Sequence, residues 1–188
     1  CRRKFLYNDV LKLPGQKKKS LVFGNCVHKA LEETFKEYKS TRLFPSFDLF
    51  EKEFLRELTF QGVDTAMERD CRNRMGTLKG WFSLASKNPV IPIDLEKKLI
   101  VTIGDDIIFN GKYDKVEWDD EAQKLVRIID YKTGKPDAHI KDIDACADLS
   151  SRQCDGYLRQ LVAYKLLFER DKKESKGRRV SRGVLVFI

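Results

Sequence analysis

Long apolar runs and paired cysteines are both missing from this 188-residue chain. No stretch approaches the roughly 20 consecutive apolar residues of a membrane span, and no signal peptide is visible, so we expect no membrane partner. The five cysteines are widely spaced without a C-x-x-C pair, which argues against a disulfide framework and against a self-contained zinc site. Reduced thiols and a cytoplasmic location are therefore the expectation.

Other absences narrow the possible functions. The sequence has no internal repeat, no low-complexity tract, no glycine-rich loop that could cradle phosphates, and no arrangement typical of a nucleophilic serine or cysteine. It also begins without methionine, at CRRKFLYN, which suggests a fragment of a larger protein.

Charge is abundant instead. Charged residues make up 35% of the chain and hydrophobic residues 41%, which is typical of a globular protein, and the length suits one domain. The net charge of +8 favours polyanionic partners, although charge alone is a weak pointer. Two basic runs lie either in solvated loops or against phosphates: Lys17, Lys18 and Lys19, then Lys172, Lys173, Lys176, Arg178, Arg179 and Arg182.

The hydrophobic pattern predicts a helical first half. Apolar residues at helical spacing indicate a helix over 21–39, with Ser20 as its N-cap. One or two further helices are expected over 47–87, with a break near Gly62. Residues 1–88 are therefore expected to be mainly helical.

Strands dominate the second half. Residues 91–103, 106–118 and 124–133 are strand-like and separated by turn residues, so a β-meander is the simplest topology. The polar residues 137–154 are irregular, with a short helix as one option, and 155–170 is a helix followed by the strand RGVLVFI. The expected fold class is α/β, a mixed sheet with a meander flanked by helices.

Two carboxylates are expected to face each other in this sheet. If the chain turns near residues 121–122, Asp114 and Asp130 become cross-strand neighbours with Cβ atoms about 5 Å apart. Like charges in that position need a cation between them, and either Lys132 or a divalent metal ion could serve. Oxygen ligands favour Mg²⁺ or Mn²⁺. The alternative is an ordinary cross-strand ion-pair cluster.

Four ordered motifs carry a family resemblance. The segments GKYDKVEWDD and KLVRIIDYKTGKP resemble the PD-(D/E)XK nuclease superfamily, specifically the RecB and AddB-like nuclease domains of helicase-nucleases, which have a G-x-x-D strand followed by a strand ending in D-Y-K-T-G. GNCVHKALE is similar to the N-terminal helix motif, and QLVAY to the Q-x-x-x-Y helix motif. The opening CRRKFLYNDVLKLPG is similar to the start of this domain in AddB-like proteins. The matching residues are His28, Gly111, Asp114, Asp130, Tyr131, Lys132, Thr133, Gly134, Gln160 and Tyr164.

The resemblance implies a restriction-endonuclease-like fold over 1–188, with the catalytic sheet and Q-x-x-x-Y helix in 89–188, and a metal-dependent DNA nuclease. The implied metal ligands are His28, Asp114, Asp130 and the backbone carbonyl of Tyr131, with Mg²⁺ or Mn²⁺ as cofactor. Lys132 is implied to orient or activate water, and Gln160 and Tyr164 either contact the DNA backbone or steady Lys132 and the attacking water. Glu32, one turn after His28, either supports the metal site or is a surface charge.

DNA is the implied substrate, an exonuclease reaction in DNA repair and recombination the implied activity, and helicase domains in the same polypeptide or in another subunit the implied partners. Candidate DNA contacts are Lys17, Lys18, Lys19, Arg159, Lys165, Arg178 and Arg179.

AddB-like nucleases bind an iron–sulfur cluster through an opening cysteine and three later ones, but no C-x-x-C follows Tyr164 here, so we expect no cluster in this chain despite Cys1.

Three alternatives to the helicase-nuclease assignment remain. A CRISPR-associated nuclease of the same superfamily normally needs those cysteines. An inactive nuclease-like DNA-binding scaffold, or a structural salt-bridge network, would not need the full set of four residues His28, Asp114, Asp130 and Lys132.

Overall fold

The computed structural model describes residues 2–11, 17–104, 107–136 and 156–188. A short α1 (Arg2–Phe5) and the single π-helical turn η1 (Leu6–Val10) precede three long helices, which are α2 (Lys19–Thr41), α3 (Phe47–Gln61) and α4 (Thr65–Ala85). The strands are β1 (Asp94–Leu95), β2 (Lys98–Ile103), β3 (Ile107–Lys112), β4 (Lys115–Asp120), β5 (Leu125–Lys132) and β6 (Arg179–Phe187). Helices α6 (Gly156–Arg170) and α7 (Lys172–Ser175) lie between β5 and β6 in the sequence.

The helical half matches the sequence prediction with one exception. Apolar residues of the predicted stripe, including Phe23, Val27 and Leu31, are buried in α2. Gly62 caps the end of α3 with a φ of 56°, a left-handed conformation that glycine adopts at little cost. The predicted N-cap is wrong, because α2 begins at Lys19 with Lys18 as N-cap, so Ser20 lies inside the first turn.

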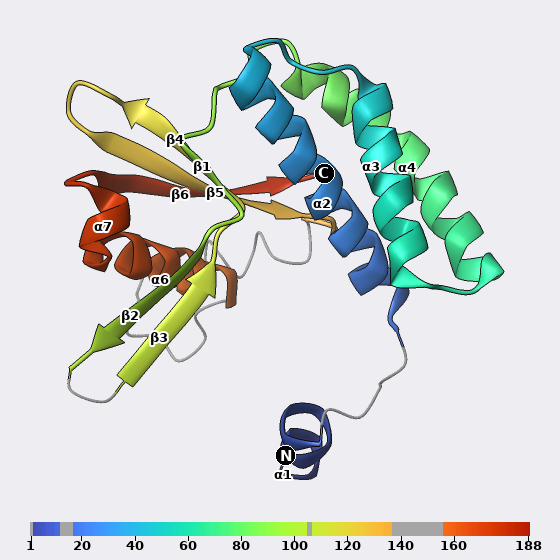
Figure 1. The fold of residues 1–188 in the computed structure, drawn as a ribbon, viewed down its shortest axis with the longest axis horizontal. Helices are drawn as coiled ribbons and strands as arrows, with labels where there is room; N and C mark the ends of the chain where they lie inside the picture. The colour runs from blue at the N-terminus through green and yellow to red at the C-terminus, as the bar shows by residue number, and fades with distance from the viewer. Residues whose placement is uncertain (1, 12–16, 105–106, 137–155) are drawn as a thin grey trace.

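The main sheet has the strand order β1-β4-β5-β6 and is mixed (Figure 1). Strands β1, β4 and β5 pair antiparallel, whereas β5 and β6 pair parallel because α6 and α7 make the crossover between them. The observed register places Lys115 opposite Ile129 and Glu117 opposite Arg127, in line with a turn near 121–122. The predicted mixed sheet flanked by helices is confirmed.

Two of the predicted strands are each broken in the middle. The run 91–103 divides into β1 and β2, and the run 106–118 divides into β3 and β4. Strands β2 and β3 form a separate two-stranded sheet, a hairpin that extends away from the main sheet (Figure 1). The first run still pairs with the second and the second with the third, in the order of the predicted meander, but both of the first two runs are interrupted where they bend.

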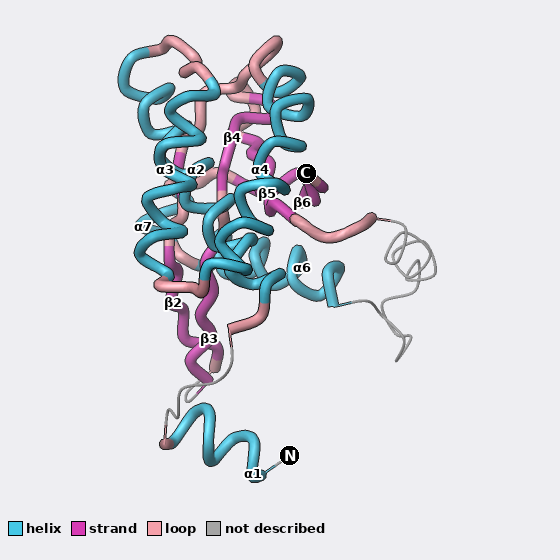
Figure 2. Tube along the Cα trace, turned by 90° about the vertical axis from the view of Figure 1, so that its right-hand side faces the viewer, coloured by secondary structure: helices cyan, strands magenta, loops and turns pink. Residues whose placement is uncertain are grey.

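Each face of the main sheet has its own apolar core. Helices α2, α3 and α4 cover one face, where Ile129 and Tyr131 of β5 join their side chains. Helix α6 packs on the other face against Val116 and Ile128, and it also packs against the β2–β3 hairpin (Figure 2). Alternation along β5 therefore sends Asp130 and Lys132 to the α6 side.

Within the described ranges, no helix is both long and apolar enough to span a membrane. Residues 137–154, for which a short helix was one option, lie outside the described residues. Cys26 and Cys71 are free and buried, while Cys1, Cys146 and Cys154 also fall outside the described part.

Candidate active site

The bend in the two long strand runs brings Glu96 and Asp114 together. Glu96 has a φ of 48°, which is rare for a residue other than glycine and is a form of backbone strain often found at functional sites. Its backbone N–H donates to the carbonyl of Asp114 at 2.8 Å. Both carboxylates therefore lie at the base of the β2–β3 hairpin, where it leaves the main sheet.

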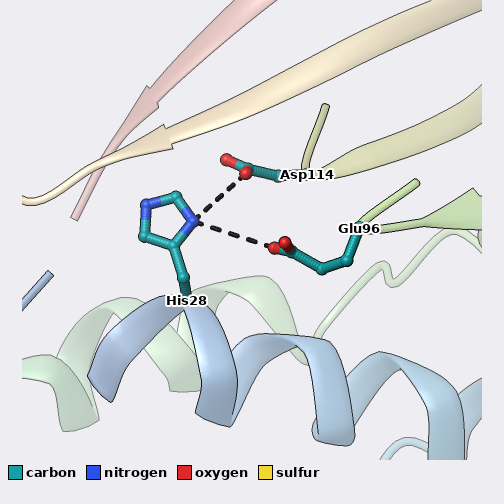
Figure 3. A group of neighbouring side chains, drawn as sticks. All are labelled: His28, Glu96 and Asp114. Atoms are coloured by element: carbon teal, nitrogen blue, oxygen red, sulfur yellow. Dashed lines mark ion pairs between the residues drawn. The ribbon is translucent and has the colours of Figure 1, made fainter. Parts of the chain in front are cut away.

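His28 of α2 completes this group (Figure 3). Its Nδ1 lies 3.1 Å from Oδ1 of Asp114 and 3.8 Å from Oε1 of Glu96. Burial lowers the pKa of His28, but the nearby carboxylates of Asp114 and Glu96 raise it by more, so the pKa reaches about 10. Without another cation, the two carboxylates hold a proton on the imidazole.

Asp130 has a different set of partners, supplied by Lys132 and α6. One carboxylate oxygen lies 2.6 Å from Nζ of Lys132, and the other accepts hydrogen bonds from Nε2 of Gln160 and from the hydroxyl of Tyr164, both at 3.1 Å. Nζ of Lys132 also donates to Oε1 of Gln160 at 2.9 Å. Burial raises the pKa of Asp130; Lys132 opposes this rise and the charge of Asp114 adds to it.

The peptide of Tyr131 connects the two groups. Its backbone N–H donates to Oδ2 of Asp114 at 2.7 Å, while the neighbouring Asp130 faces α6. The Tyr131 ring lies on the opposite side of the strand, stacked on Phe35 in the helical core. A strand anchored on both sides in this way fixes the spacing between the Asp114 and Asp130 carboxylates.

The donor set suits a divalent metal ion. His28, Glu96 and Asp114 each offer a ligand atom, and these atoms all lie within 4.8 Å of one another. One imidazole nitrogen and two carboxylate oxygens are ligands that Mn²⁺ accepts readily and Mg²⁺ tolerates. Asp130 is outside this close group, and its oxygens contact Lys132, Gln160 and Tyr164 instead.

The sequence model of the PD-(D/E)XK nuclease superfamily matches residues 1–188, the whole chain. The chain belongs to this superfamily. Its members are nucleases that use divalent metal ions, and the mixed sheet flanked by helices agrees with their restriction-endonuclease-like fold. No curated protein and no solved structure matches the chain.

Among the residues expected from sequence, those of the D-Y-K and Q-x-x-x-Y motifs lie together. His28 and Asp114 are in contact, and Asp130, Lys132, Gln160 and Tyr164 form one hydrogen-bonded cluster. Glu32 instead forms ion pairs with Lys29 and Lys36 on α2, at 2.9 and 2.5 Å. These pairs favour the surface-charge alternative for Glu32, although it lines the same hollow as His28.

The predicted DNA contacts differ in how free their side chains are. Lys17, Lys18, Lys19, Arg159 and Arg179 are exposed. Lys165 pairs with Glu169 at 2.6 Å and donates to the carbonyl of Val180.

Arg178 is far more enclosed than the others. Its guanidinium lies over the rings of Trp118 and Phe168 and donates to the carbonyls of Ser175 and Glu174. With a side chain only 10% exposed, Arg178 is a poor candidate for contacting phosphate.

Sequence reasoning missed Glu96. It lies in IPIDLEKKLIV, a run that looks like one continuous strand, and its role depends on a bend that hydrophobic alternation does not reveal. The sequence signal for Glu96 is an acidic residue in the middle of an apolar strand, at the position that lies opposite Asp114 of the neighbouring strand. Lys112, which forms an ion pair with the second oxygen of Glu96, was missed for the same reason.

Proposed function

We propose that this chain is a Mg²⁺- or Mn²⁺-dependent deoxyribonuclease that hydrolyses phosphodiester bonds as an exonuclease. We further propose that it is the nuclease domain of a RecB/AddB-like helicase-nuclease in DNA repair and recombination. The contacts of Asp114 are the observation that supports this proposal most strongly. It contacts His28 through one oxygen and accepts from the Tyr131 peptide through the other, and so joins the three-ligand group to the Asp130–Lys132 pair.

The ligand roles follow from the donor atoms. Nδ1 of His28 and carboxylate oxygens of Glu96 and Asp114 would hold the cation, with Asp130 and the Tyr131 carbonyl completing its surroundings. A divalent cation bound there supplies a more acidic water and neutralises charge on the phosphodiester. The raised pKa of His28 has the same cause, because the carboxylates of Asp114 and Glu96 favour a positive charge at this position.

Lys132 is placed to act on the attacking water and on the phosphate. Its ammonium group is fixed by Asp130 and Gln160 rather than free in solvent, and its side chain is 18% exposed. A pre-oriented donor of this kind stabilises negative charge that develops in the transition state without reorganisation at the moment of reaction.

Gln160 and Tyr164 fit a positioning role better than direct contact with the DNA backbone. Nε2 of Gln160 donates to both the Tyr164 hydroxyl, at 2.6 Å, and Asp130, while Oε1 accepts from Lys132. Every polar atom of the Gln160 side chain is therefore used within the cluster. The exposed Lys17–Lys19, Arg159 and Arg179 remain candidates for phosphate contact.

The wider setting belongs to the same proposal. Residues 1–88 would form the mainly helical part of one domain and residues 89–188 its catalytic sheet and Q-x-x-x-Y helix. Helicase domains in the same polypeptide or in a partner subunit would feed DNA to the site in the cytoplasm.

The direct test incubates the chain with linear single-stranded and duplex DNA in Mn²⁺, in Mg²⁺ and in EDTA. We expect metal-dependent cutting that Lys132→Ala abolishes while circular dichroism shows the fold intact. DNA binding without cutting in either metal would instead support the inactive scaffold. End-labelled and circular substrates then separate exonuclease from endonuclease action.

A further inference from the structure

One face of the β2–β3 hairpin is packed near the main sheet, with Ile107 at its tip 64% exposed, and the other face is open. Leu99 and Val101 are buried against α6, and a Cβ built on Gly111 would lie 2.6 Å from Cδ1 of Leu167. Within the described part of the chain the two strands pair with each other alone, as a separate sheet. The hairpin is thus held against α6 by one face, and its direction relative to the metal ligands is fixed.

The other face is exposed along its whole described length. Alternation and the cross-strand register place three facing pairs on it, which we call the open hairpin face: Lys98 with Lys112, Ile100 with Asn110, and Thr102 with Ile108. All six residues are exposed. The lysine pair lies at the active-site end and the two isoleucines lie further out.

Two features of this face are unfavourable for an isolated protein. Ile100 and Ile108 expose 58% and 70% of their surface, although strands normally turn such side chains inward. Lys98 and Lys112 stand directly opposite each other, so their like charges repel across the hairpin, and the pairing of Lys112 with Glu96 offsets only part of this repulsion. A ligand that is both anionic and apolar would compensate for both.

The open hairpin face leads into the active site. Lys112 pairs with Glu96, and both residues line a hollow of about 210 Å³ together with His28. A polymer whose phosphate occupies the site would therefore continue past Lys112 and Lys98 onto the isoleucines.

We propose that the open hairpin face binds a single strand of DNA, with Lys98 and Lys112 on phosphates beside the site and Ile100 and Ile108 against unpaired bases. This inference rests on the proposed nuclease function. A duplex presents phosphates and groove edges, whereas unpaired bases offer the apolar faces that exposed isoleucines can cover. The face therefore selects single-stranded over duplex DNA at the site.

The test measures binding in EDTA, so that no strand is cut, by fluorescence anisotropy of a labelled 12-nucleotide oligothymidylate and of a 12-base-pair duplex. The double variant Ile100→Thr/Ile108→Thr keeps β-branched side chains and so retains strand propensity. We expect it to bind the oligothymidylate about tenfold more weakly, the low end of the effect of losing base contacts. Duplex binding should change less than about twofold on the same scale.

Two controls locate the effect. Leu43→Thr removes an exposed apolar side chain of similar size, 75% exposed, outside the hairpin and should leave both affinities unchanged. Lys98→Gln should lower the slope of log affinity against log salt for the oligothymidylate by about 0.7, the loss of one phosphate contact.

The possible outcomes distinguish a failure of the proposed single-strand binding from a failure of the proposed nuclease function. Unchanged oligothymidylate affinity in the double variant overturns the inference, even if the wild type cuts DNA. A wild type that self-associates, and a double variant that is monomeric with full DNA affinity, would identify the face as a protein interface and also overturn it. If no metal supports cutting but the double variant loses single-strand binding, the proposed function fails and the binding face stands.

Discussion

A cluster of charged side chains lies on each side of strands β4 and β5, and the two clusters are unbalanced in opposite directions. On the helical face, Glu117 pairs with Lys115 at 2.6 Å and with Arg127 at 2.8 Å, so one carboxylate serves two cations. The Lys115 ammonium also lies 3.8 Å from the centre of the Phe35 ring, whose negative face offsets part of the remaining charge. With positive charge in excess, this cluster has no demand for a further cation.

The α6 face and the hairpin base have the reverse balance. Glu96, Asp114 and Asp130 supply three carboxylates, and Lys112 and Lys132 supply two ammonium groups. The missing positive charge comes from the proton that the carboxylates hold on His28, or from a metal ion in its place. We call the group around Glu117 the closed cluster, because it has no demand for a cation and stabilises the fold. We call the group of Glu96, Asp114 and Asp130 the open cluster, because it lacks a cation and is suited to bind one.

Asp130→Asn, which changes the open cluster, should give the largest effect. The change removes a carboxylate from the site and should reduce cutting by about 10³-fold, as the loss of a pre-organised electrostatic group does elsewhere. Because burial raises the Asp130 pKa, its ionised form is disfavoured in the folded state, and the neutral amide should leave stability unchanged or higher. Initial rates in Mn²⁺ and urea unfolding in EDTA measure the two effects. A destabilised but active variant would contradict this assignment.

Glu117→Gln, in the closed cluster, should have the opposite effect, because it should lower stability and leave the cutting rate unchanged. It leaves the Lys115 ammonium buried beside a neutral amide, and breaking a buried pair by removing one partner costs about 3 kcal/mol of unfolding free energy or more. Urea unfolding measures this loss. The folded fraction should cut DNA at the wild-type rate per molecule, because Glu117 faces the helical core. Equal losses of stability and specific activity would mean that the two faces are not independent.

Glu96→Gln tests whether the cation belongs to the three-ligand group. Replacing one carboxylate by an amide should weaken Mn²⁺ binding about tenfold, and so reduce the stabilisation by saturating Mn²⁺ by about 1.4 kcal/mol. Thermal unfolding across a Mn²⁺ titration reports the change. Glu32→Gln, which alters a nearby carboxylate that is already paired with two lysines, is the matched control. Equal Mn²⁺ responses in the two variants would remove Glu96 from the ligand set.

The open cluster was only partly predictable from sequence. The register of β4 and β5 follows from the turn position, because cross-strand register is set locally, but it does not reveal that Asp114 and Asp130 contact different partners. The i, i+4 spacing of Gln160 and Tyr164 places both on one side of α6. Glu96 could not be found in this way. Its position depends on a positive φ and on a hairpin that leaves the sheet and packs against α6, and the pattern of the strand reveals neither.

The closed cluster was also not anticipated, for a different reason. Lys115 and Glu117 alternate with Val116 and Trp118, the pattern of a strand with one exposed polar face. The structure buries that face under α2 and α4, so the polar residues had to pair with one another and with Arg127. Alternation shows which residues share a face, but it does not show which faces will be covered.

Gly111→Ala gives the smallest expected effect and tests how firmly the hairpin is held against the open cluster. The added Cβ would lie 2.6 Å from Cδ1 of Leu167 and 3.8 Å from Cε1 of Tyr164. Leu167 is buried and has little room to move, so we expect a loss of about 1 kcal/mol in urea unfolding, at the low end for overpacking.

The matched control is Gly76→Ala in α4, where a Cβ would meet nothing within 4 Å. There the substitution should stabilise by about 0.5–1 kcal/mol, because alanine is the better residue inside a helix. Only Gly111→Ala should also reduce cutting, because displaced Leu167 pushes on the helix whose Tyr164 hydroxyl holds Asp130. A hairpin that shifted freely would absorb the new methyl group with no change in rate, and the spacing between Glu96, Asp114 and Asp130 would then have to be fixed by the main sheet alone.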